Sequence, residues 1–468
     1  MQNPYPTVTA TTTTVELAMS KWFDRQKNSF LKQRPSFLQA PSVESKQFEQ
    51  LFRYAFNCFR LFALTPGQMT SQKEGFVVRD TRWMKLTVSV LVVLVWIALV
   101  ESFRVDYGTA LITGIANHIQ LITNTIALTV AWIVPQLKAS ELQAILEGYL
   151  VIDRELSSYK LPDLTRPTKG NFLLRYGLVL LGLTFLVAYD GFVSFGKPHS
   201  PPEWYWLATQ IPFVVQAMGI FHAFLLISWL HERFQHLNAL VEQYYRQGLE
   251  FSAKKVATAF ATPIKLTDGS ALVNVVLDDT SNRRELADDL QILAIVSRSI
   301  DLAEKIESYF GPLFLTVYTA LFTVTTIQSY YCYLHLNSID ERRGLSVESL
   351  VLSGGIILAN VIAIVALPFI CERVEQESKL LMSFLSKLSM RPGQQAQHSS
   401  IWFSNLIASV RFSALGFFTI NYNMLSGLVA GLVTYLIIFI QFNSMVPAGK
   451  DDLHFARSKN PRPQMDSN

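Results

Sequence analysis

Polar and aromatic side chains interrupt several long apolar stretches of this sequence. Asp190 is the ionisable one, and an ionisable residue inside a membrane is costly, so it marks a functional site by default. A carboxylate accepts hydrogen bonds from hydroxyl groups, amides add more, and indole rings cover the apolar face of a small ring. The set suits a polyhydroxylated ligand that enters from outside; its members are Asp190, Trp204, Trp206, Gln210, Gln216, His118, Gln328, Tyr330 and Tyr331.

Each of these residues also has a structural interpretation of about equal weight. The aromatic run 204–206 matches an interfacial belt, and Asp190 at the mouth of a bundle can simply face water. A lone histidine in an apolar helix is more often a hydrogen-bonded structural residue than a ligand, which is the default for His118 and His222. As a group, the residues favour a pocket over the structural interpretation.

A second set lies in the last apolar stretch, 421–441, at steps of four, three, four and three that keep its members on one helix face: Gly427, Gly431, Thr434, Ile438 and Gln441. The two glycines alone predict only close helix packing within one chain. The added threonine and glutamine favour a face toward water, with Ile438 as an apolar constriction and Gln441 as a polar ring in symmetry-related copies. Without a charged ring, such a pore discriminates weakly among cations.

Enzymatic chemistry finds no support in the sequence. It holds no Gly-rich phosphate loop, no His-Glu-x-x-His and no Gly-x-Ser-x-Gly. Cys58, Cys332 and Cys371 lie too far apart for a metal motif or a disulfide framework. We therefore expect no catalytic residue, no bound metal and no cofactor.

Composition predicts a polytopic membrane protein. Of the 468 residues, 50% are hydrophobic and only 16% are charged, whereas about a quarter are charged in ordinary soluble domains. The net charge of +4 gives no reason to expect a nucleic-acid partner. The N-terminus has no basic segment before an apolar core, so a cleaved signal peptide is not expected.

Seven spans of about 20 residues match the thickness of a bilayer. They fall at 84–103, 109–134, 172–195, 205–230, 312–336, 351–370 and 421–441. Basic residues gather in the N-terminal segment and in the second and sixth connections, which places the N-terminus in the cytosol and, after seven spans, the C-terminus outside. Basic residues in the C-terminal tail mildly disagree with this orientation.

The expected fold class is an all-α membrane protein with seven transmembrane helices and a cytosolic helical anchor region. Residues 1–80 form a cytosolic N-terminal segment, and 84–370 hold helices one to six with an outward-facing pocket and a long cytosolic connection at 231–310. Residues 371–412 supply anchor helices, including a short one at 401–412, before the pore-lining helix 421–442 and an extracellular tail 443–468. The apolar faces of the cytosolic helices pack on each other or form a subunit interface.

A motif in the last span resembles the signature of insect gustatory receptors: Thr434-Tyr435, five hydrophobic residues, then Gln441-Phe442. The architecture resembles that family over residues 50–445. The resemblance implies a homotetramer, or a heteromer with related subunits, that forms a ligand-gated channel in the plasma membrane, passes monovalent cations and calcium, and contacts lipid. It also implies that Ile438, Gln441 and Phe442 form the gate region and that a small-molecule tastant binds among the second to sixth spans.

The ligand class stays open between alternatives. The last span lacks the Glu after Tyr435 of the main sugar-receptor branch, while Asp190-Gly191 and Trp204-Tyr205 resemble the fructose-sensing branch. A sugar such as fructose is the first hypothesis, and a bitter or apolar ligand for the same channel is the second. A receptor coupled to G proteins needs the opposite orientation and lacks its Asp-Arg-Tyr and Asn-Pro-x-x-Tyr motifs. A transporter ranks last, since the chain shows neither an inverted repeat nor paired broken helices.

Overall fold

The computed structural model describes residues 43–72, 75–79, 82–104, 111–159, 169–196, 203–261, 279–337, 347–389 and 410–445. The helices that carry the candidate sites belong to the compact unit Gln47–Asn468. The predictions for residues 1–42, for most of the helix at 401–412 and for the tail from residue 446 onward lie outside the described ranges.

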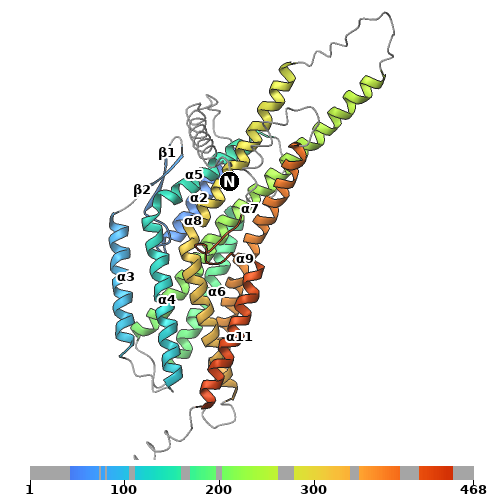
Figure 1. Ribbon diagram of the computed structural model, residues 1–468. Coiled ribbons are helices and arrows are strands. Elements are labelled where there is room, and N and C mark those ends of the chain that lie inside the picture. Colours follow the sequence, from blue (N-terminus) through green and yellow to red (C-terminus); the bar gives the residue numbers. More distant parts are fainter. Residues whose placement is uncertain are drawn as a thin grey trace, which may run out of the picture. The chain divides into compact units, whose positions relative to one another are not determined.

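Within the described ranges, seven helices are long and apolar enough to cross a membrane (Figure 1). They are α3 (Arg82–Ser102), α4 (Leu111–Leu137), α6 (Lys169–Phe195), α7 (Glu203–Ala261), α8 (Asp279–Asn337), α9 (Val347–Ser389) and α11 (Tyr422–Met445). Each contains its predicted span to within two residues, so the all-α class with seven spans is confirmed. Which side of the membrane each terminus occupies stays a prediction.

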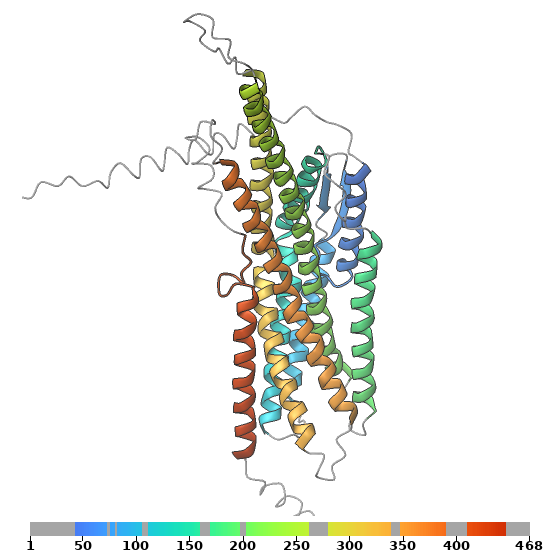
Figure 2. The same ribbon diagram turned by 90° about the vertical axis from the view of Figure 1, so that its right-hand side faces the viewer.

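Three of these helices are much longer than a bilayer needs. The chain runs without a break from the fourth span to Ala261, from Asp279 into the fifth span, and from the sixth span to Ser389. The steps of apolar residues predict helices that continue past the membrane to about Tyr245 and begin again near Arg284, because they keep one face apolar. The helices are longer than that, since α7 reaches Ala261 in a segment expected to be a linker and α8 begins at Asp279. The long helices α7, α8 and α9 pack on one another, and α11 lies beside α8 and α9 at the edge of the bundle (Figure 2).

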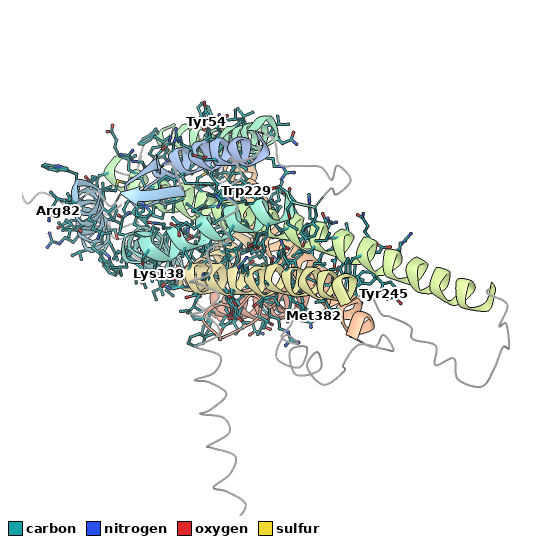
Figure 3. All side chains as sticks on the ribbon, turned by 90° about the horizontal axis from the view of Figure 1, so that it is seen from above. Tyr54, Arg82, Lys138, Trp229, Tyr245 and Met382 are labelled. Atoms are coloured by element: carbon teal, nitrogen blue, oxygen red, sulfur yellow. The ribbon has the colours of Figure 1, made fainter. Side chains whose placement is uncertain are left out.

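A short amphipathic helix, α2 (Val43–Arg60), precedes the first span. Its apolar face packs on protein rather than lying along the membrane: the Phe52 ring lies edge-on to Trp229 with centroids 4.7 Å apart, and Phe59 stacks on His222 at 4.3 Å. Figure 3 shows Trp229 inside this packing and Tyr54 at its outer edge. An antiparallel hairpin of β1 (Gln68–Gln72) and β2 (Gly75–Arg79) follows, which the sequence patterns did not predict.

The second connection holds a helix that the span analysis missed, α5 (Ala139–Leu156). Its signal is present in the sequence as buried apolar residues at helical spacing, namely Leu142, Ile145, Leu146, Tyr149, Ile152 and Leu156. Burial raises the pKa of the Tyr149 phenol above its usual range, so the hydroxyl stays protonated and donates to the Leu226 carbonyl at 2.5 Å. Asp153 on the same helix pairs with Arg233 on α7, and α5 is thereby fixed against α7.

A tight turn at Val410–Asn421 leads into α11. The predicted helix at 401–412 does not reach its predicted end, because residues 410–412 lie outside any helix and Ser413 pairs with Thr419 across the turn. The backbone N–H of Ser413 donates to Glu307 Oε1 on α8 at 3.1 Å. Leu415 has a φ of 53° and packs over Gly311, where an added Cβ would lie 3.2 Å from the Leu415 side chain. The turn is therefore seated on α8 immediately before the pore-helix candidate begins.

Candidate ligand site and pore helix

Asp190, Trp206 and Gln210 come together between α6 and α7. Asp190 Oδ2 accepts a hydrogen bond from Trp206 Nε1 at 2.7 Å and one from Gln210 Nε2 at 2.6 Å. Phe195, from the last turn of α6, packs against the Trp206 ring with centroids 5.5 Å apart. The group is half-buried and combines a carboxylate, an amide and two aromatic rings, which is the donor and acceptor chemistry that a small polyhydroxylated molecule needs.

Gly191 lets the Trp206 indole approach α6 closely. A Cβ added at Gly191 would lie 3.2 Å from Trp206 Cζ2, which is too close without a shift of the ring. We therefore expect Gly191→Ala to destabilise the protein by about 1 kcal/mol through overpacking and to lengthen the Trp206–Asp190 hydrogen bond. Gly177 on the same helix faces open space, so Gly177→Ala is the matched control. Thermal unfolding of both variants in detergent measures the difference; equal midpoints would contradict the close contact.

A second polar group joins α4 to α8. The Tyr331 hydroxyl donates to Asn117 Oδ1, which links the C-terminal part of α8 to the beginning of α4. His118 is part of the same turn of α4: its ring stacks on Phe103 with centroids 4.6 Å apart, and its Nδ1 lies 2.6 Å from the Gly114 carbonyl oxygen. Both contacts support the structural role that was the default for His118.

The other predicted ligand residues lie in different surroundings. Gln216 is buried and donates to the backbone carbonyl of Asn124 at 3.2 Å, so it holds α7 against α4. Trp204 is 40% exposed, as expected for an interfacial residue. Gln328 is half-buried on α8, and Tyr330 is fully buried. Of the nine predicted residues, hydrogen bonds therefore unite Asp190, Trp206 and Gln210.

The last helix, α11, differs from the other spans in its surroundings. None of the residues in its span, Tyr422–Phe442, is buried in the chain. Ile438 and Phe442 are 37% and 58% exposed, and Gly427 has open space beyond its Cα. The hydroxyl of Thr434 is satisfied within its own helix by the Ala430 carbonyl at 2.8 Å. An apolar helix with this much uncovered surface meets lipid or another protein subunit.

Aromatic contacts fix α11 against α8. Phe439 stacks on Tyr330 with centroids 5.4 Å apart, and Tyr435 lies edge-on to Phe322 at 5.9 Å. Gly431 faces Phe322, where an added Cβ would lie 3.3 Å from the ring. The five residues predicted to share one face of α11 therefore differ in their surroundings. Gly431 packs on α8, while Gly427, Thr434, Ile438 and Gln441 remain exposed.

The residues that make this contact were not predicted as a contact. Phe439 and Phe322 counted only as apolar residues of their spans, and Tyr435 was named only as part of the motif in the last span. The available signal is the spacing of the aromatic residues, because Tyr435 and Phe439 are four residues apart, and residues at that spacing share one helix face. That spacing indicates an aromatic face but does not name its partner helix.

Comparison with known proteins identifies the family. The model of the 7tm chemosensory receptor family matches residues 52–446. The chain belongs to this family and is a multi-pass membrane receptor. Family membership confirms both the predicted chemosensory class and the prediction that the chain is not an enzyme. The fructose-sensing branch stays a prediction.

The individual proteins that resemble this chain are distant from it in sequence. The chain is 27% identical to Gustatory receptor 23a of Drosophila melanogaster over 141 residues, a match that spans 30% of this chain and 37% of that protein. The insect olfactory receptor OR5 from Machilis hrabei matches the fold with a TM-score of 0.53 at 12% identity in its complex with eugenol and at 11% identity in its other structure. Each match covers 85% of this chain and 99% or 100% of the olfactory receptor chain, which shows the shared fold.

Proposed function

We propose that this protein is a gustatory receptor that acts as a ligand-gated, weakly selective cation channel opened by a small extracellular sugar such as fructose. It works in the plasma membrane with a cytosolic N-terminus, as a homotetramer or a heteromer with related subunits. Monovalent cations and calcium pass along a path lined by α11, and lipid surrounds the remaining spans.

The observation that carries the channel proposal is the uncovered surface of α11. The helix is apolar along its length, yet its span contributes no buried residue to the chain. Its uncovered face carries Thr434, Ile438 and Gln441 at helical spacing, beside the aromatic contacts with α8. Symmetry-related copies of this helix around one axis would cover the apolar surface and line a path with alternating apolar and polar rings.

A physical connection between the ligand group and the pore helix supports gating. Helix α7, which carries Trp206 and Gln210, packs against α4 and α8, and α4 joins α8 through Tyr331 and Asn117. The residue before Tyr331 is Tyr330, which stacks on Phe439 of α11. A ligand that prefers one arrangement of the outer helices thereby biases the position of α11, and only such a preference opens the pore.

Asp190 is the residue on which the sugar hypothesis depends. We expect Asp190→Asn to raise the sugar concentration for half-maximal current by about 10–100-fold, because a hydrogen bond to a charged group contributes about 1.5–3 kcal/mol. Patch-clamp recording of concentration–response curves measures the shift. Glu203→Gln is the matched control, since it neutralises an exposed carboxylate in the first turn of α7. Unchanged sugar-evoked currents in Asp190→Asn would remove this site from the proposal.

The function itself is tested by expressing this chain alone and recording currents against a panel of sugars and bitter compounds. Sugar-evoked, weakly selective cation currents are the expected result. Epitope tags at both ends test the orientation, and an extracellular N-terminus would be incompatible with the channel proposal. A G-protein-dependent response without direct current would favour the coupled-receptor alternative.

A second candidate is the same channel gated by an apolar or bitter molecule. This alternative is favoured because Asp190 Oδ2 already accepts two hydrogen bonds within the protein. Asp190, Trp206 and Gln210 thereby also hold α6 against α7. The structural relative from Machilis hrabei was determined in complex with eugenol, which is a phenol and not a sugar. Currents evoked by phenolic compounds but by no sugar would establish this alternative.

A further inference from the structure

Prolines inside four of the membrane helices free backbone carbonyls that must find other partners. Pro135 in α4, Pro212 in α7, Pro312 in α8 and Pro368 in α9 lack an N–H, so each leaves the carbonyl four residues earlier without its helical hydrogen bond. Inside a membrane such groups are satisfied by neighbouring helices, by side chains or by ordered water. Each freed carbonyl therefore predicts a donor close to it.

Side chains from neighbouring segments supply the donor at two of these four prolines, Pro312 and Pro368. Lys138 Nζ, just after α4, donates to the Ser308 carbonyl that Pro312 frees, at 2.8 Å. The Tyr318 hydroxyl of α8 donates to the Ile364 carbonyl that Pro368 frees, at 3.4 Å. Of the other two, Pro135 frees the carbonyl of Ala131 in α4 and Pro212 frees that of Ala208 in α7.

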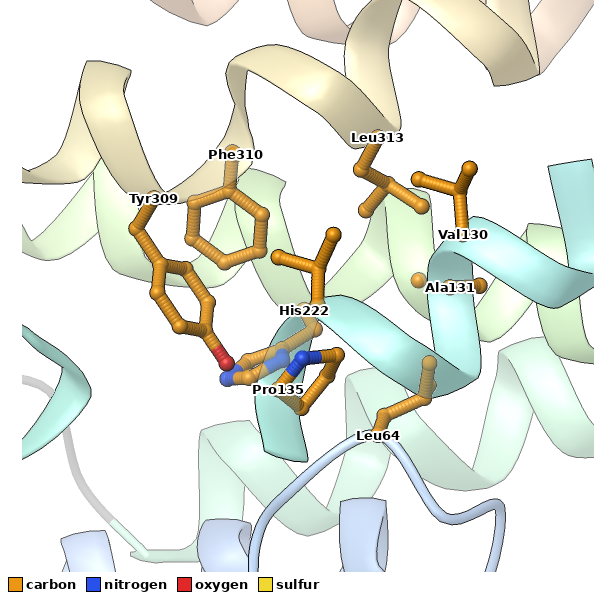
Figure 4. A pocket seen from close by; sticks show the side chains of 10 residues that line it. Leu64, Val130, Ala131, Pro135, His222, Tyr309, Phe310 and Leu313 are labelled. Atoms are coloured by element: carbon orange, nitrogen blue, oxygen red, sulfur yellow. The ribbon is translucent and has the colours of Figure 1, made fainter. Parts of the chain in front are cut away.

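A cavity borders Ala131, the residue whose carbonyl Pro135 frees. It is enclosed by α4, α7, α8 and the turn after α2, and it is lined by Leu64, Val130, Ala131, Val134, Pro135, Gly219, His222, Tyr309, Phe310 and Leu313 (Figure 4). Tyr309 is 2% exposed, and its hydroxyl has no hydrogen-bond partner among the residues that the structure describes. In Figure 4 this hydroxyl points toward the ring of His222, which lines the same cavity.

The volume of this cavity limits which molecule it can hold. The cavity has a volume of about 10 Å³, at the lower limit of the roughly 10–15 Å³ that holds one water molecule. A sugar or an aromatic ligand is far too large, and an apolar atom would leave the Tyr309 hydroxyl unpaired. A water molecule offers two donors and two acceptors, and typical buried waters make about three hydrogen bonds.

We propose that this cavity is a binding site for a single ordered water molecule that donates to the Ala131 carbonyl and bonds the Tyr309 hydroxyl and the His222 imidazole. The water serves the Ala131 carbonyl as Lys138 and Tyr318 serve the carbonyls freed by Pro312 and Pro368, and it ties α4, α7 and α8 together at the proline of α4. The site is separate from the Asp190 group and does not depend on the proposed function.

Two substitutions in the full-length receptor test the site by the sign of their effects. Tyr309→Phe removes a hydroxyl that costs stability if it is unpaired and adds stability if it bonds water. We expect the midpoint of thermal unfolding in detergent to fall by about 1–3 °C, in the same direction as in Tyr318→Phe, where the hydroxyl bonds a freed carbonyl directly. An unchanged or raised midpoint in Tyr309→Phe would overturn the proposal.

Gly219→Ala tests whether the cavity is occupied. Its Cβ would lie 3.5 Å from Leu313 Cδ2 and 3.8 Å from Leu64 Cδ2, so the methyl group fits among the lining residues and displaces water without a clash. Gly182→Ala is the matched control, because Gly182 is a helical glycine that faces open space. With water displaced, Gly219→Ala should unfold at a lower temperature than Gly182→Ala. A higher midpoint would show a dry cavity, or a direct bond between Tyr309 and His222, and would overturn the proposal.

Electron cryo-microscopy of the wild-type receptor tests the site independently of folding in the variants. Density for one water within hydrogen-bond distance of Ala131 O and Tyr309 Oη is the expected result. A map that shows ordered waters elsewhere in the bundle but none in this cavity would overturn the proposal.

Discussion

Replacing Asp153 with alanine is expected to destabilise the receptor by about 3–5 kcal/mol, because it removes the two-atom partner of a buried guanidinium and leaves only the longer contact with Glu232, at 3.5 Å. Arg233 has a side chain only 6% exposed and bonds Asp153 through two atoms, Nε to Oδ1 at 3.0 Å and Nη2 to Oδ2 at 2.8 Å. Its Nη1 also donates to the Trp229 carbonyl at 2.9 Å. The loss should appear as a lower unfolding midpoint in detergent and as less receptor at the cell surface.

Two comparisons separate this effect from a general loss of charge. Glu242 and Arg246 form an exposed pair one turn apart on α7, and Glu242→Ala should change stability by less than about 0.5 kcal/mol. The double variant Asp153→Leu with Arg233→Met removes both buried charges and should recover much of the loss. If Asp153→Ala were as mild as Glu242→Ala, the pair would not hold α5 against α7.

The spans were predictable because the membrane imposes one simple condition on them. About 20 apolar residues in succession are required wherever a helix crosses the bilayer, and the segments 172–195 and 351–370 satisfy it without reference to any partner. The continuation of α7 and α9 beyond the bilayer was predictable for a related reason, since the apolar face keeps its helical period in residues that carry charges on the other face.

Contacts between helices were not predictable in this way. Tyr149 donates to Leu226, and Gln216 donates to Asn124, across separations of 77 and 92 residues. Helical spacing places a residue on a face, but it does not say toward which neighbour that face turns. For the same reason the nine ligand residues were named from polarity alone, while the structure unites Asp190, Trp206 and Gln210 by hydrogen bonds and gives Gln216 a packing role.

Helix α11 shows what residue spacing can and cannot predict. The spacing of three and four residues along α11 places Thr434, Ile438 and Gln441 on one face, and other residues of the chain do not bury that face. The same steps include Gly431, which the structure turns toward Phe322 of α8. A close approach of two helices and a water path both favour small residues, so glycine alone cannot distinguish them.

Replacing Ile438 with serine is expected to raise the resting current of the proposed channel by about tenfold or more. An isoleucine side chain withdrawn from water contributes roughly 1.5–3 kcal/mol, and a ring of these side chains opposes wetting of the constriction. Each 1.4 kcal/mol removed from the closed state shifts the equilibrium tenfold, and every subunit contributes. The effect is measured as ligand-independent current in cells with equal surface expression.

Val433→Ser is the matched control for this prediction. Val433 is exposed on the same helix, but it lies five residues from Ile438 and hence about 140° around the helix axis. The substitution makes the same change from a β-branched apolar residue to serine, outside the face that carries Thr434 and Gln441. Resting current should therefore rise in Ile438→Ser and stay near the wild-type level in Val433→Ser. Equal behaviour of the two variants would mean that the face of Ile438 meets lipid, and the water path would then have to lie along another face of α11.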